Sequence, residues 1–426
     1  MFATLSLIHS VLFLLAFAAS GESTEQDEKY LQFPPKFLLG VATAAYQIEG
    51  AWNVSDKGES TWDRYTHLQN GRVYNNDTGD VAANSYYKYK EDVALIKQLG
   101  FNTYRFSVSW PRILPTGFAN SISTDVLEDA GGWLNSEIVD WFGDYARIVF
   151  EQYAPKVKKF IPINEPSAVC KNGYSIGIHA PGKTLHGFGY MPRSADDEYA
   201  AEVSFQFNIG WTMHPIYSEE GDYPPIMKNL VSNKSLKQGY LRSRLPTFTP
   251  EWINYTRGAS DFLAINHYTT RLVTNGSMGR IPSHENDQGI VEVVDSFWKG
   301  SASEWLKVVP EGFRYILQQL SKYYGNPPMY ITENGVSDYG TLDDDDRIFY
   351  FREYLKQMLL AIHVDGVNVK GYMVWSLLDN FEWDKGYNEH FGIVSVDFND
   401  PERPRTLKKS ASWWKKVIAA RRIDTS

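Results

Sequence analysis

Strand-like and helix-like segments alternate along almost the whole chain, and this alternation constrains the fold more than any other feature. Short apolar or β-rich runs lie at 37–43, 102–109, 159–164, 261–268, 329–332 and 371–376. Amphipathic helical patterns lie at 86–99, 137–153, 303–324, 345–363 and 410–422. Pro310 is expected to interrupt the third of these helices. An unbroken series of this kind, with no linker or repeat, predicts a parallel sheet covered by helices.

Two architectures fit such a sheet: an open, doubly wound sheet and a closed barrel. Residues suited to chemistry stand at the ends of many strands rather than one: Gln47, Arg105, Glu165, Tyr268, Glu333 and Trp375. A barrel brings the carboxyl ends of all its strands together around one pocket. A doubly wound sheet concentrates its site at one switch point and usually carries a Gly-rich phosphate loop, which this sequence lacks. The sequence therefore predicts a (β/α)8 TIM barrel.

Two of the strand ends carry a glutamate in a tight polar setting. Glu165 lies in Ile-Asn-Glu-Pro, and Glu333 lies in Ile-Thr-Glu-Asn-Gly. Retaining glycosidases need two carboxyl groups about 5–5.5 Å apart, which strands on opposite sides of a barrel mouth can supply. Either motif alone is more often a capping or ion-pairing group, so the surrounding sequence has to decide.

Further motifs surround these two glutamates in a fixed order. They are FLLGVATAAYQIEG at 37–50, KGESTWD at 57–63, YRFS at 104–107, SWPRI at 109–113, NEP at 164–166, DFLAINHYT at 261–269, TENG at 332–335, WSLLDNFEW at 375–383, and GY and FGI within 386–393. From about residue 33 to 420 the chain resembles glycoside hydrolase family 1. The nearest resemblance within it is to animal, particularly insect, β-glucosidases and myrosinase-like enzymes. The resemblance implies a (β/α)8 fold and a retaining β-glycosidase that acts on small β-D-glucosides without metal or cofactor.

The resemblance also implies which residues carry the reaction. Glu165 is the expected general acid, and later base, and Glu333 the expected nucleophile that forms a glycosyl-enzyme intermediate. Arg105 and Tyr268 are expected to hydrogen-bond Glu333 and to hold it in the ionised form. Plant myrosinases lack the acid glutamate, so its presence here favours O-glycosides, while a myrosinase-like thioglucosidase remains an alternative.

Five more residues are implied for substrate binding. Asn164 would bind the sugar 2-hydroxyl, an interaction that strengthens in the transition state. Gln47, Glu382 and Trp383 resemble the family's sugar-binding set, since an amide and a carboxylate can each hold two hydroxyls. Trp375 would form a stacking floor on the leaving-group side. The alternative for both tryptophans is core packing at a strand end.

The resemblance lapses at two places. Asp125 runs directly into Val126, where the family continues with a helix and a third strand that bears a sugar-binding His. After 173–182 the next helix and the fifth strand are absent, and the chain resumes near Asp196. Because one helix-strand unit averages about 30 residues, the sequence predicts an incomplete barrel, from a splice form or a faulty gene model. An inactive or misfolded truncated isoform is therefore the main alternative to an active enzyme.

The N-terminus predicts a secreted protein. Residues 1–20 read as a signal peptide with no Lys, Arg, Asp or Glu, 21–32 as a leader, and 33–426 as a single glycosidase domain. An uncleaved anchor is the alternative, but the apolar run is short for a membrane span. Five glycosylation sequons support secretion to an extracellular space such as a gut lumen: Asn53, Asn76, Asn233, Asn254 and Asn275.

Composition excludes several other classes of protein. A formal net charge of −9 argues against nucleic acid or anionic membranes as partners. Cys170 is the sole cysteine, so neither an internal disulfide nor a thiolate zinc site can form. A phosphate- or metal-dependent barrel enzyme lacks its phosphate loop and its His/Asp ligand cluster here. The aromatic content of 15% fits a large core or stacking surfaces for sugar rings.

Overall fold

The computed structural model describes residues 30–68, 71–119, 127, 129–166, 189–277, 279 and 281–424. The predicted signal peptide, most of the predicted leader, Cys170 and the Asp125–Val126 junction lie outside these residues. No helix in the described part is both long enough and apolar enough to cross a membrane.

The central sheet has five strands that all run parallel to their neighbours. They are β1 (Leu38–Ala42), β2 (Thr103–Arg105), β4 (Leu263–Asn266), β7 (Met329–Asn334) and β8 (Val369–Val374). Their order is β2-β1-β8-β7-β4, so the first strand in sequence pairs with the last. A barrel closes by that pairing, whereas a doubly wound sheet keeps its first and last strands apart. The sheet is thus the closing part of a (β/α)8 barrel.

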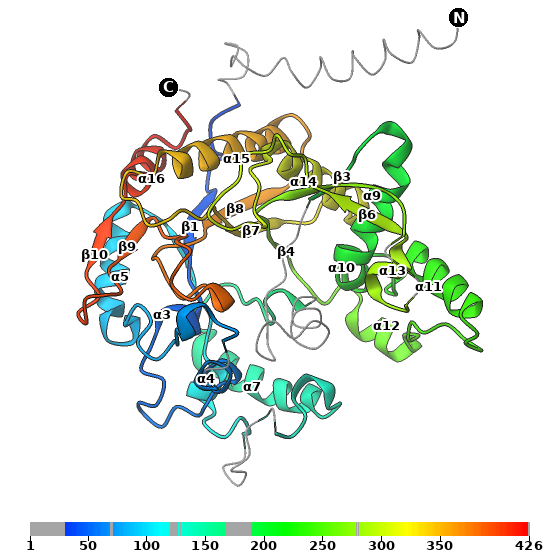
Figure 1. Cartoon of the computed structure of the whole chain (residues 1–426), viewed down its shortest axis with the longest axis horizontal. Coiled ribbons are helices and arrows are strands. Elements are labelled where there is room, and N and C mark those ends of the chain that lie inside the picture. The colour runs from blue at the N-terminus through cyan, green and yellow to red at the C-terminus, as the bar shows by residue number, and fades with distance from the viewer. Residues whose placement is uncertain are drawn as a thin grey trace, which may run out of the picture.

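The helices between these strands cover the outer side of the sheet. Figure 1 shows α14 (Pro310–Tyr324), α15 (Asp345–His363) and α16 (Lys409–Ala420) along one side, and α5 (Ser85–Leu99) continues the row beyond α16. Four of the predicted helices are confirmed to within two residues at each end. The prediction of helix at 303–309 is wrong: the helix begins at Pro310, because proline fits the first turn, where its missing N–H is not needed.

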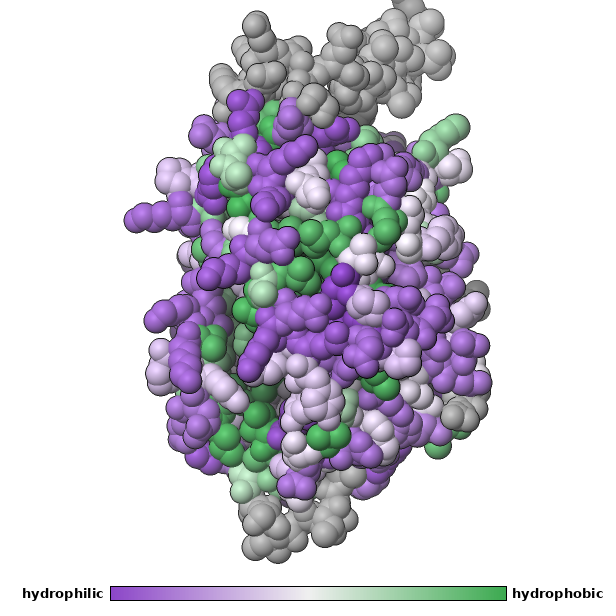
Figure 2. Space-filling view, turned by 90° about the vertical axis from the view of Figure 1, so that its left-hand side faces the viewer, coloured by the Kyte–Doolittle hydropathy of each residue, from purple (hydrophilic) through white to green (hydrophobic). Residues whose placement is uncertain are grey.

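The core lies between this sheet and these helices. Every residue of β7 is buried, as are four of the five residues in β1. The aromatic side chains of Tyr350, Tyr354 and Trp414 are fully buried against these strands from α15 and α16. Strands covered on both faces read as nearly continuous apolar runs, which explains why the sequence pattern located them. Figure 2 shows the face formed by α5, β9 (Val394–Val396), β10 (Arg405–Leu407) and α16 to be mostly hydrophilic, with hydrophobic residues in bands between.

The sheet has two open edges. β2 pairs with β1 alone, and β4 pairs with β7 alone, among the residues that the structure describes. The strand predicted at 159–164 is wrong, because this segment lies outside every strand. The units on either side of it are the two that the sequence analysis expects to be missing, and among the described residues no strand shares a hydrogen-bond ladder with this segment.

The 159–164 segment nevertheless spans the space between the two open edges through its side chains. Asn164 accepts a hydrogen bond from Arg105 of β2 at 2.5 Å and another from Asn266 of β4 at 3.1 Å. Lys159 lies over the rings of Phe262 and Tyr330, 5.4 and 4.8 Å from their centroids. The segment thus occupies the side of the barrel where strand four is expected, without strand geometry.

The helix that precedes this segment is poorly covered. α7 (Ile138–Tyr153) has a strongly amphipathic sequence, yet Ile138 and Val149 are its two buried residues. Val139 and Phe150 remain 57% and 40% exposed. In a complete barrel such a helix packs its apolar face on the sheet. Its exposure follows from the open edge beneath it.

The remaining elements lie beside the barrel sheet. A second sheet, which the sequence pattern did not predict, contains β3 (Gly189–Pro192), β5 (Thr270–Asn275) and β6 (Ile290–Val293) in the order β3-β5-β6. Strands β9 and β10 form an antiparallel pair. The other helices are α3 (Ala45–Ile48), α4 (Thr61–His67), α6 (Trp110–Ile113), α9 (Glu198–Phe205), α10 (Trp211–Tyr217), α11 (Pro225–Lys237), α12 (Pro250–Thr256) and α13 (His284–Gln288).

Candidate active site

Glu333 lies at the carboxyl end of β7 and is held by two donors. Tyr268 Oη donates to its Oε2 at 2.6 Å, and Arg105 Nη1 donates to its Oε1. Burial, followed by the nearby Glu333 and Glu165, raises the pKa of Tyr268 well above its usual value, so the phenol keeps its proton and donates. The predicted partners of Glu333 are therefore both present, at the ends of β2 and β4.

The same network reaches the other glutamate. Asn266 Nδ2, at the end of β4, donates to Glu165 Oε1 at 2.5 Å and to Asn164 Oδ1 at 3.1 Å. Thr332 Oγ1 in turn donates to Asn266 Oδ1 at 2.7 Å, which fixes the orientation of that amide. Hydrogen bonds among neighbouring side chains thus connect Glu165 to β7, the strand that carries Glu333.

The two sides of this network differ in exposure. Glu333 is 5% exposed, whereas Asn164 is exposed and Glu165 is half-buried. Glu333 lies on β7, which pairs with a strand on each side. Glu165 directly follows the 159–164 segment, which pairs with no strand among the described residues. The Glu333 side is therefore enclosed and ordered by backbone pairing, whereas Glu165 lies outside the strands and is contacted by the Asn266 side chain.

Three of the predicted substrate-binding residues, Trp375, Glu382 and Trp383, lie on the loop that follows β8, and Gln47 of α3 contacts this loop. Gln47, which is 1% exposed, donates through Nε2 to Asn380 Oδ1 and to the Phe381 carbonyl, both at 2.8 Å. Its Nε2 also lies 3.4 Å from Glu382 Oε2. Among the described residues, Glu382 Oε1 is buried without a hydrogen-bond partner. An uncommitted carboxylate oxygen next to an anchored amide is suited to accept hydrogen bonds from sugar hydroxyls.

The charge on Glu382 is disfavoured by its surroundings. Burial, and then the nearby carboxyls of Glu389 and Glu333, raise its pKa well above the usual value, against the effect of a hydrogen bond from the Trp375 indole. Trp375 itself is 5% exposed and directly follows β8. Trp383 is half-buried, with its ring 4.8 Å from that of Trp62. Both tryptophans thus border the sugar-binding loop, and stacking on substrate remains a prediction.

Three residues of this network received no role from the sequence. Asn266 orients Glu165, Thr332 orients Asn266, and Asn380 accepts from Gln47. Asn266 ends a strand, as Glu333 and Arg105 do, and that position was the available signal. The other two act on neighbours far away in sequence, which spacing does not reveal.

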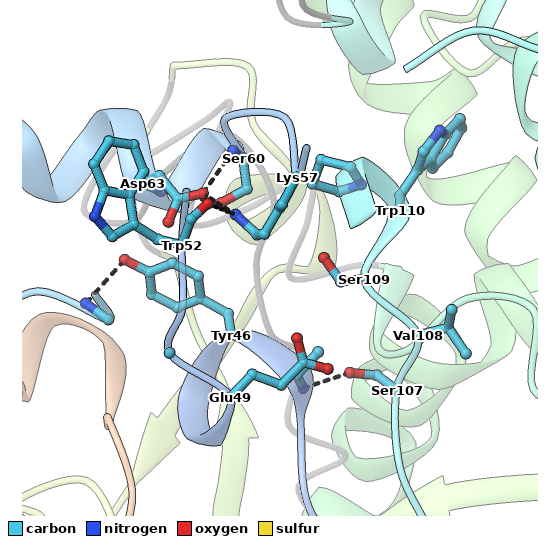
Figure 3. A pocket seen from close by; sticks show the side chains of 14 residues that line it. Tyr46, Glu49, Trp52, Lys57, Ser60, Asp63, Ser107, Val108, Ser109 and Trp110 are labelled. Carbon is cyan, nitrogen blue, oxygen red and sulfur yellow. Dashed lines mark hydrogen bonds and ion pairs between the residues drawn. The ribbon is translucent and has the colours of Figure 1, made fainter. Parts of the chain in front are cut away.

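A separate pocket of about 190 Å³ lies beside this network, and Figure 3 shows its lining. Tyr46, Glu49, Trp52 and the buried Lys57–Asp63 ion pair form one side, and the segment 107–111 forms the other. None of the predicted catalytic or sugar-binding residues lines it. Because 107–111 follows β2, the pocket borders the strand with an open edge, and it does not define the active site.

Metal chemistry has no evident site here. Within the described ranges, no group of three or more His, Cys, Asp or Glu side chains is placed to hold a metal ion.

The sequence matches the family model "Glycosyl hydrolase family 1" over three pieces: 29–126, 123–191 and 187–423. The pieces meet at 123–126 and at 187–191. The first junction coincides with the first predicted gap, and the second lies within the interval of the other, between 182 and 196. The match therefore covers nearly the whole chain and is interrupted where the sequence predicted missing units.

Known proteins resemble the chain over most of its length. "Myrosinase 1" of Brevicoryne brassicae is 42% identical over 461 positions, covering 91% of this chain and 98% of the relative. The solved structure "Aphid myrosinase" is 40% identical with a TM-score of 0.85, covering 91% of this chain and 99% of that one. A glucose complex of a GH1 β-glucosidase from the fungus Humicola insolens is 32% identical with a TM-score of 0.83, covering 93% and 100%.

The alignment with the aphid protein also gives the approximate number of residues that this chain lacks relative to it. It spans 461 positions, but 91% of 426 residues is about 388, so about 73 positions of the alignment have no counterpart in this chain. Two helix-strand units of about 30 residues each account for most of that difference.

Proposed function

Because this chain belongs to glycosyl hydrolase family 1, a family of retaining β-glycosidases, we propose that it hydrolyses β-D-glucosides of the O-linked kind. Glu333 is the proposed nucleophile and Glu165 the proposed acid and base. The observation that carries this assignment is the enclosure of Glu333 at the end of β7, with Tyr268 and Arg105 as donors to its two oxygens.

The proposed reaction proceeds in two displacements. Glu333 attacks the anomeric carbon while Glu165 passes its proton to the leaving oxygen, giving a covalent glycosyl-enzyme. Glu165, now ionised, takes a proton from water, which attacks the same carbon and releases Glu333. Arg105 donates to Glu333 through one nitrogen and to Asn164 through the other, so it connects the proposed nucleophile to the residue expected to bind the 2-hydroxyl.

Glucose-type substrates fit the remaining contacts. Gln47 of α3 and Glu382 of the loop after β8 present an amide and a carboxylate side by side, which together can hold adjacent hydroxyls. Such polar contacts discriminate strongly against sugars that lack the matching hydroxyl, because the buried groups are then left unpaired. The leaving group would lie toward the exposed side, where Asn164 and Glu165 are found.

A thioglucosidase is the second candidate, and it is favoured by the 42% identity with the aphid "Myrosinase 1". A thiol leaves as a thiolate far more readily than an alcohol leaves as an alkoxide, so S-glycosides depend little on an acid. The contact of Asn266 with Glu165 supports the O-glycoside reading, because it retains a carboxyl group on the leaving-group side. Comparing wild type with Glu165→Ala on matched O- and S-glucosides separates the two.

A glycoside-binding protein without turnover is the third candidate, and the unpaired 159–164 segment favours it. Labelling with an activated 2-fluoro aryl glucoside is the decisive experiment, because a good leaving group makes covalent capture independent of the acid. Label on the peptide that contains Glu333 supports the proposal even if turnover is slow. Label on another residue, or none at saturating reagent, refutes it.

We further propose that the protein is secreted and glycosylated. The asparagines of all five sequons are exposed: Asn53, Asn76, Asn233, Asn254 and Asn275. Exposure is what a bulky glycan requires. Expression in insect cells with and without residues 1–20 tests this directly. Secretion of an endoglycosidase-sensitive protein that depends on these residues is the expected result.

A further inference from the structure

A buried carboxylate lies just behind the sugar-binding loop. Asp379 is fully buried, and its Oδ1 accepts hydrogen bonds from Lys408 Nζ and from the Gly392 amide, each at 2.9 Å. His390 Nδ1 lies 3.1 Å from its Oδ2. Burial alone raises the pKa of Asp379, but Lys408, His390 and Arg347 together hold it below its usual range.

Asp379 is directly connected to the residues that face the sugar. The next residue, Asn380, accepts the hydrogen bond from Gln47, and Glu382 follows two residues later. Asp379 N–H donates to the Val394 carbonyl at 2.9 Å, so its backbone is tied to β9. Any displacement of Asp379 therefore moves the amide and the carboxylate that hold the substrate.

The cation comes from a distant part of the chain. Lys408, which is 1% exposed, immediately precedes α16, and its N–H donates to the Ile393 carbonyl at 3.0 Å. Its Nζ also lies 3.6 Å from Asp338 Oδ1. Asp338 in turn pairs with the buried Arg347 of α15. The helices on the outer side of the barrel thus fix the position of Lys408.

Packing leaves the loop little freedom to adjust. A Cβ added at Gly392 would lie 2.1 Å from Asp379 N and 2.7 Å from the Val394 carbonyl oxygen. The two segments approach so closely that only glycine fits. The position of Asp379 relative to β9 is therefore fixed by the close packing against Gly392 and by the ion pair with Lys408.

We propose that Lys408 and Asp379 form a positioning pair that holds Asn380 and Glu382 in place and thereby sets the affinity for the sugar ring. The proposal rests on the proposed β-glucosidase function. Removing Lys408 leaves a carboxylate buried without its close cation, an arrangement that proteins relieve by protonation or movement. Either response displaces the loop. Removing both charges should restore the position of the loop, because neither member of the pair is then buried without the other.

Three variants test this: Lys408→Met, the double variant Lys408→Met/Asp379→Asn, and the matched control Arg405→Met. Arg405 and Asp92 also form a buried ion pair at 2.9 Å, between β10 and α5, and it does not touch the loop. For each variant, calorimetry gives the dissociation constant of a glucose-configured iminosugar and the melting temperature. The rate of Glu333 labelling at saturating 2-fluoro glucoside is also measured.

Lys408→Met is expected to weaken iminosugar binding by about 10- to 100-fold, as for a site displaced by about 1 Å, with Glu333 still labelled. The double variant should recover most of the affinity, and Arg405→Met should lower the melting temperature without changing affinity. Equal affinity losses in Lys408→Met and Arg405→Met, or no recovery in the double variant, overturn the pair. If Lys408→Met does not fold, Asp379→Asn is used as the single variant in its place. Weaker binding that the double variant restores then supports the pair, and a loss equal to that of Arg405→Met, or no recovery, overturns it. A wild type that neither binds nor is labelled instead rejects the proposed function, and with it the role of the pair.

Discussion

The side-chain amide of Asn266 donates to Glu165 Oε1 at 2.5 Å, although Glu165 lies outside every strand that the structure describes. In a complete barrel, backbone pairing of strand four would place this glutamate. Here the Asn266 amide, itself oriented by Thr332 at 2.7 Å, contacts it through a side-chain hydrogen bond. The two glutamates of the proposed catalytic pair are thus held differently: Glu333 lies on a strand that pairs on both sides, and Glu165 is contacted by the side chain of Asn266.

Glu333→Gln should lower kcat/KM on an aryl β-D-glucoside by about 10³-fold or more, because a neutral amide cannot form the glycosyl ester. The fold should survive, since the Gln amide oxygen can still accept from Arg105, and the Tyr268 hydroxyl can rotate to accept from the amide NH2. Steady-state kinetics and a melting curve measure both effects. A variant of near-normal rate would remove Glu333 from the role of nucleophile.

Glu165→Ala should affect substrates according to their leaving groups. Glycosides of poor leaving groups need the proton from Glu165 and should lose far more rate than activated aryl glycosides. The basic limb of the pH profile should flatten as well, because this limb reports the loss of the protonated acid. A series of aryl glucosides with graded phenol pKa values tests this. Equal losses across the series would contradict the acid role.

The sequence predicted the strand-paired half of the site well and the other half poorly. Glu333 lies near the end of β7, which is buried throughout, so a short apolar run leading to a polar residue marked it. Arg105 ends β2, a half-buried edge strand, and was marked by its place at the end of a β-rich run. The run at 159–164 has the same local pattern but no ladder, because strand formation depends on neighbours that the local sequence does not specify. The local pattern therefore located candidate strand segments, and pairing with neighbouring strands determined which of these segments formed strands.

Contacts between segments that lie far apart in the chain were the second feature that the sequence did not predict. The link between Lys408 and Asp379 joins residues 29 positions apart, and the hydrogen bond from Gln47 to Asn380 joins residues 333 apart. No periodicity encodes such pairs. The second sheet was likewise missed, because β3 and β6 are four residues each and pair through β5, which runs between them.

Glu382→Gln should stabilise the protein at neutral pH while it weakens sugar binding. Glu382 has a raised pKa in the folded state, chiefly from burial. Below the unfolded-state pKa of about 4.3, Glu382 is protonated in both the folded and the unfolded chain, so it does not change the free energy of unfolding. As the pH rises through this value, the unfolded chain releases its proton and the folded chain resists, so the folded state loses stability up to its own raised pKa.

The glutamine variant carries no such charge, so the difference in melting temperature should grow from pH 4 to pH 7. One pKa unit is worth about 1.4 kcal/mol, or roughly 1–2 °C in melting temperature for a chain of 426 residues, because the entropy of unfolding is about 2.1 cal/mol/K per residue. Glu353→Gln, at a half-exposed position on α15 away from the site, is the matched control and should show little pH-dependent gain. A constant difference between wild type and Glu382→Gln across this range would contradict the burial of the charge.

Restoring the two missing helix-strand units should raise both stability and activity. The units would be inserted at 125/126 and between 182 and 196, in the sequence of a family 1 relative. They would give β2 and β4 their second partners and allow 159–164 to pair. They would also cover the exposed apolar side chains at the open side, among them Phe106, Val139 and Phe150.

The expected size of the effect follows from the surface involved. At about 25 cal/mol per Å², covering 400 Å² of apolar surface contributes on the order of 10 kcal/mol, comparable with the whole stability of a domain. Open strand edges and uncovered apolar surface also favour self-association. The chain as it stands should therefore melt at a lower temperature and form oligomers or aggregates. Light scattering after size exclusion and differential scanning calorimetry measure these two properties.

Activity should follow the position of Glu165. Catalytic groups must be held to within about 0.5 Å, and a displacement of 1 Å can cost about 10²-fold in rate. The restored version should therefore exceed the present chain by at least about 10²-fold in kcat/KM on an aryl β-glucoside, and Glu333→Gln in the restored background should abolish the gain. If the present chain is instead a monomer that melts cooperatively with comparable kcat/KM, the side-chain contacts of Asn164, Glu165 and Lys159 suffice to replace strand four, and the open edges are not a defect.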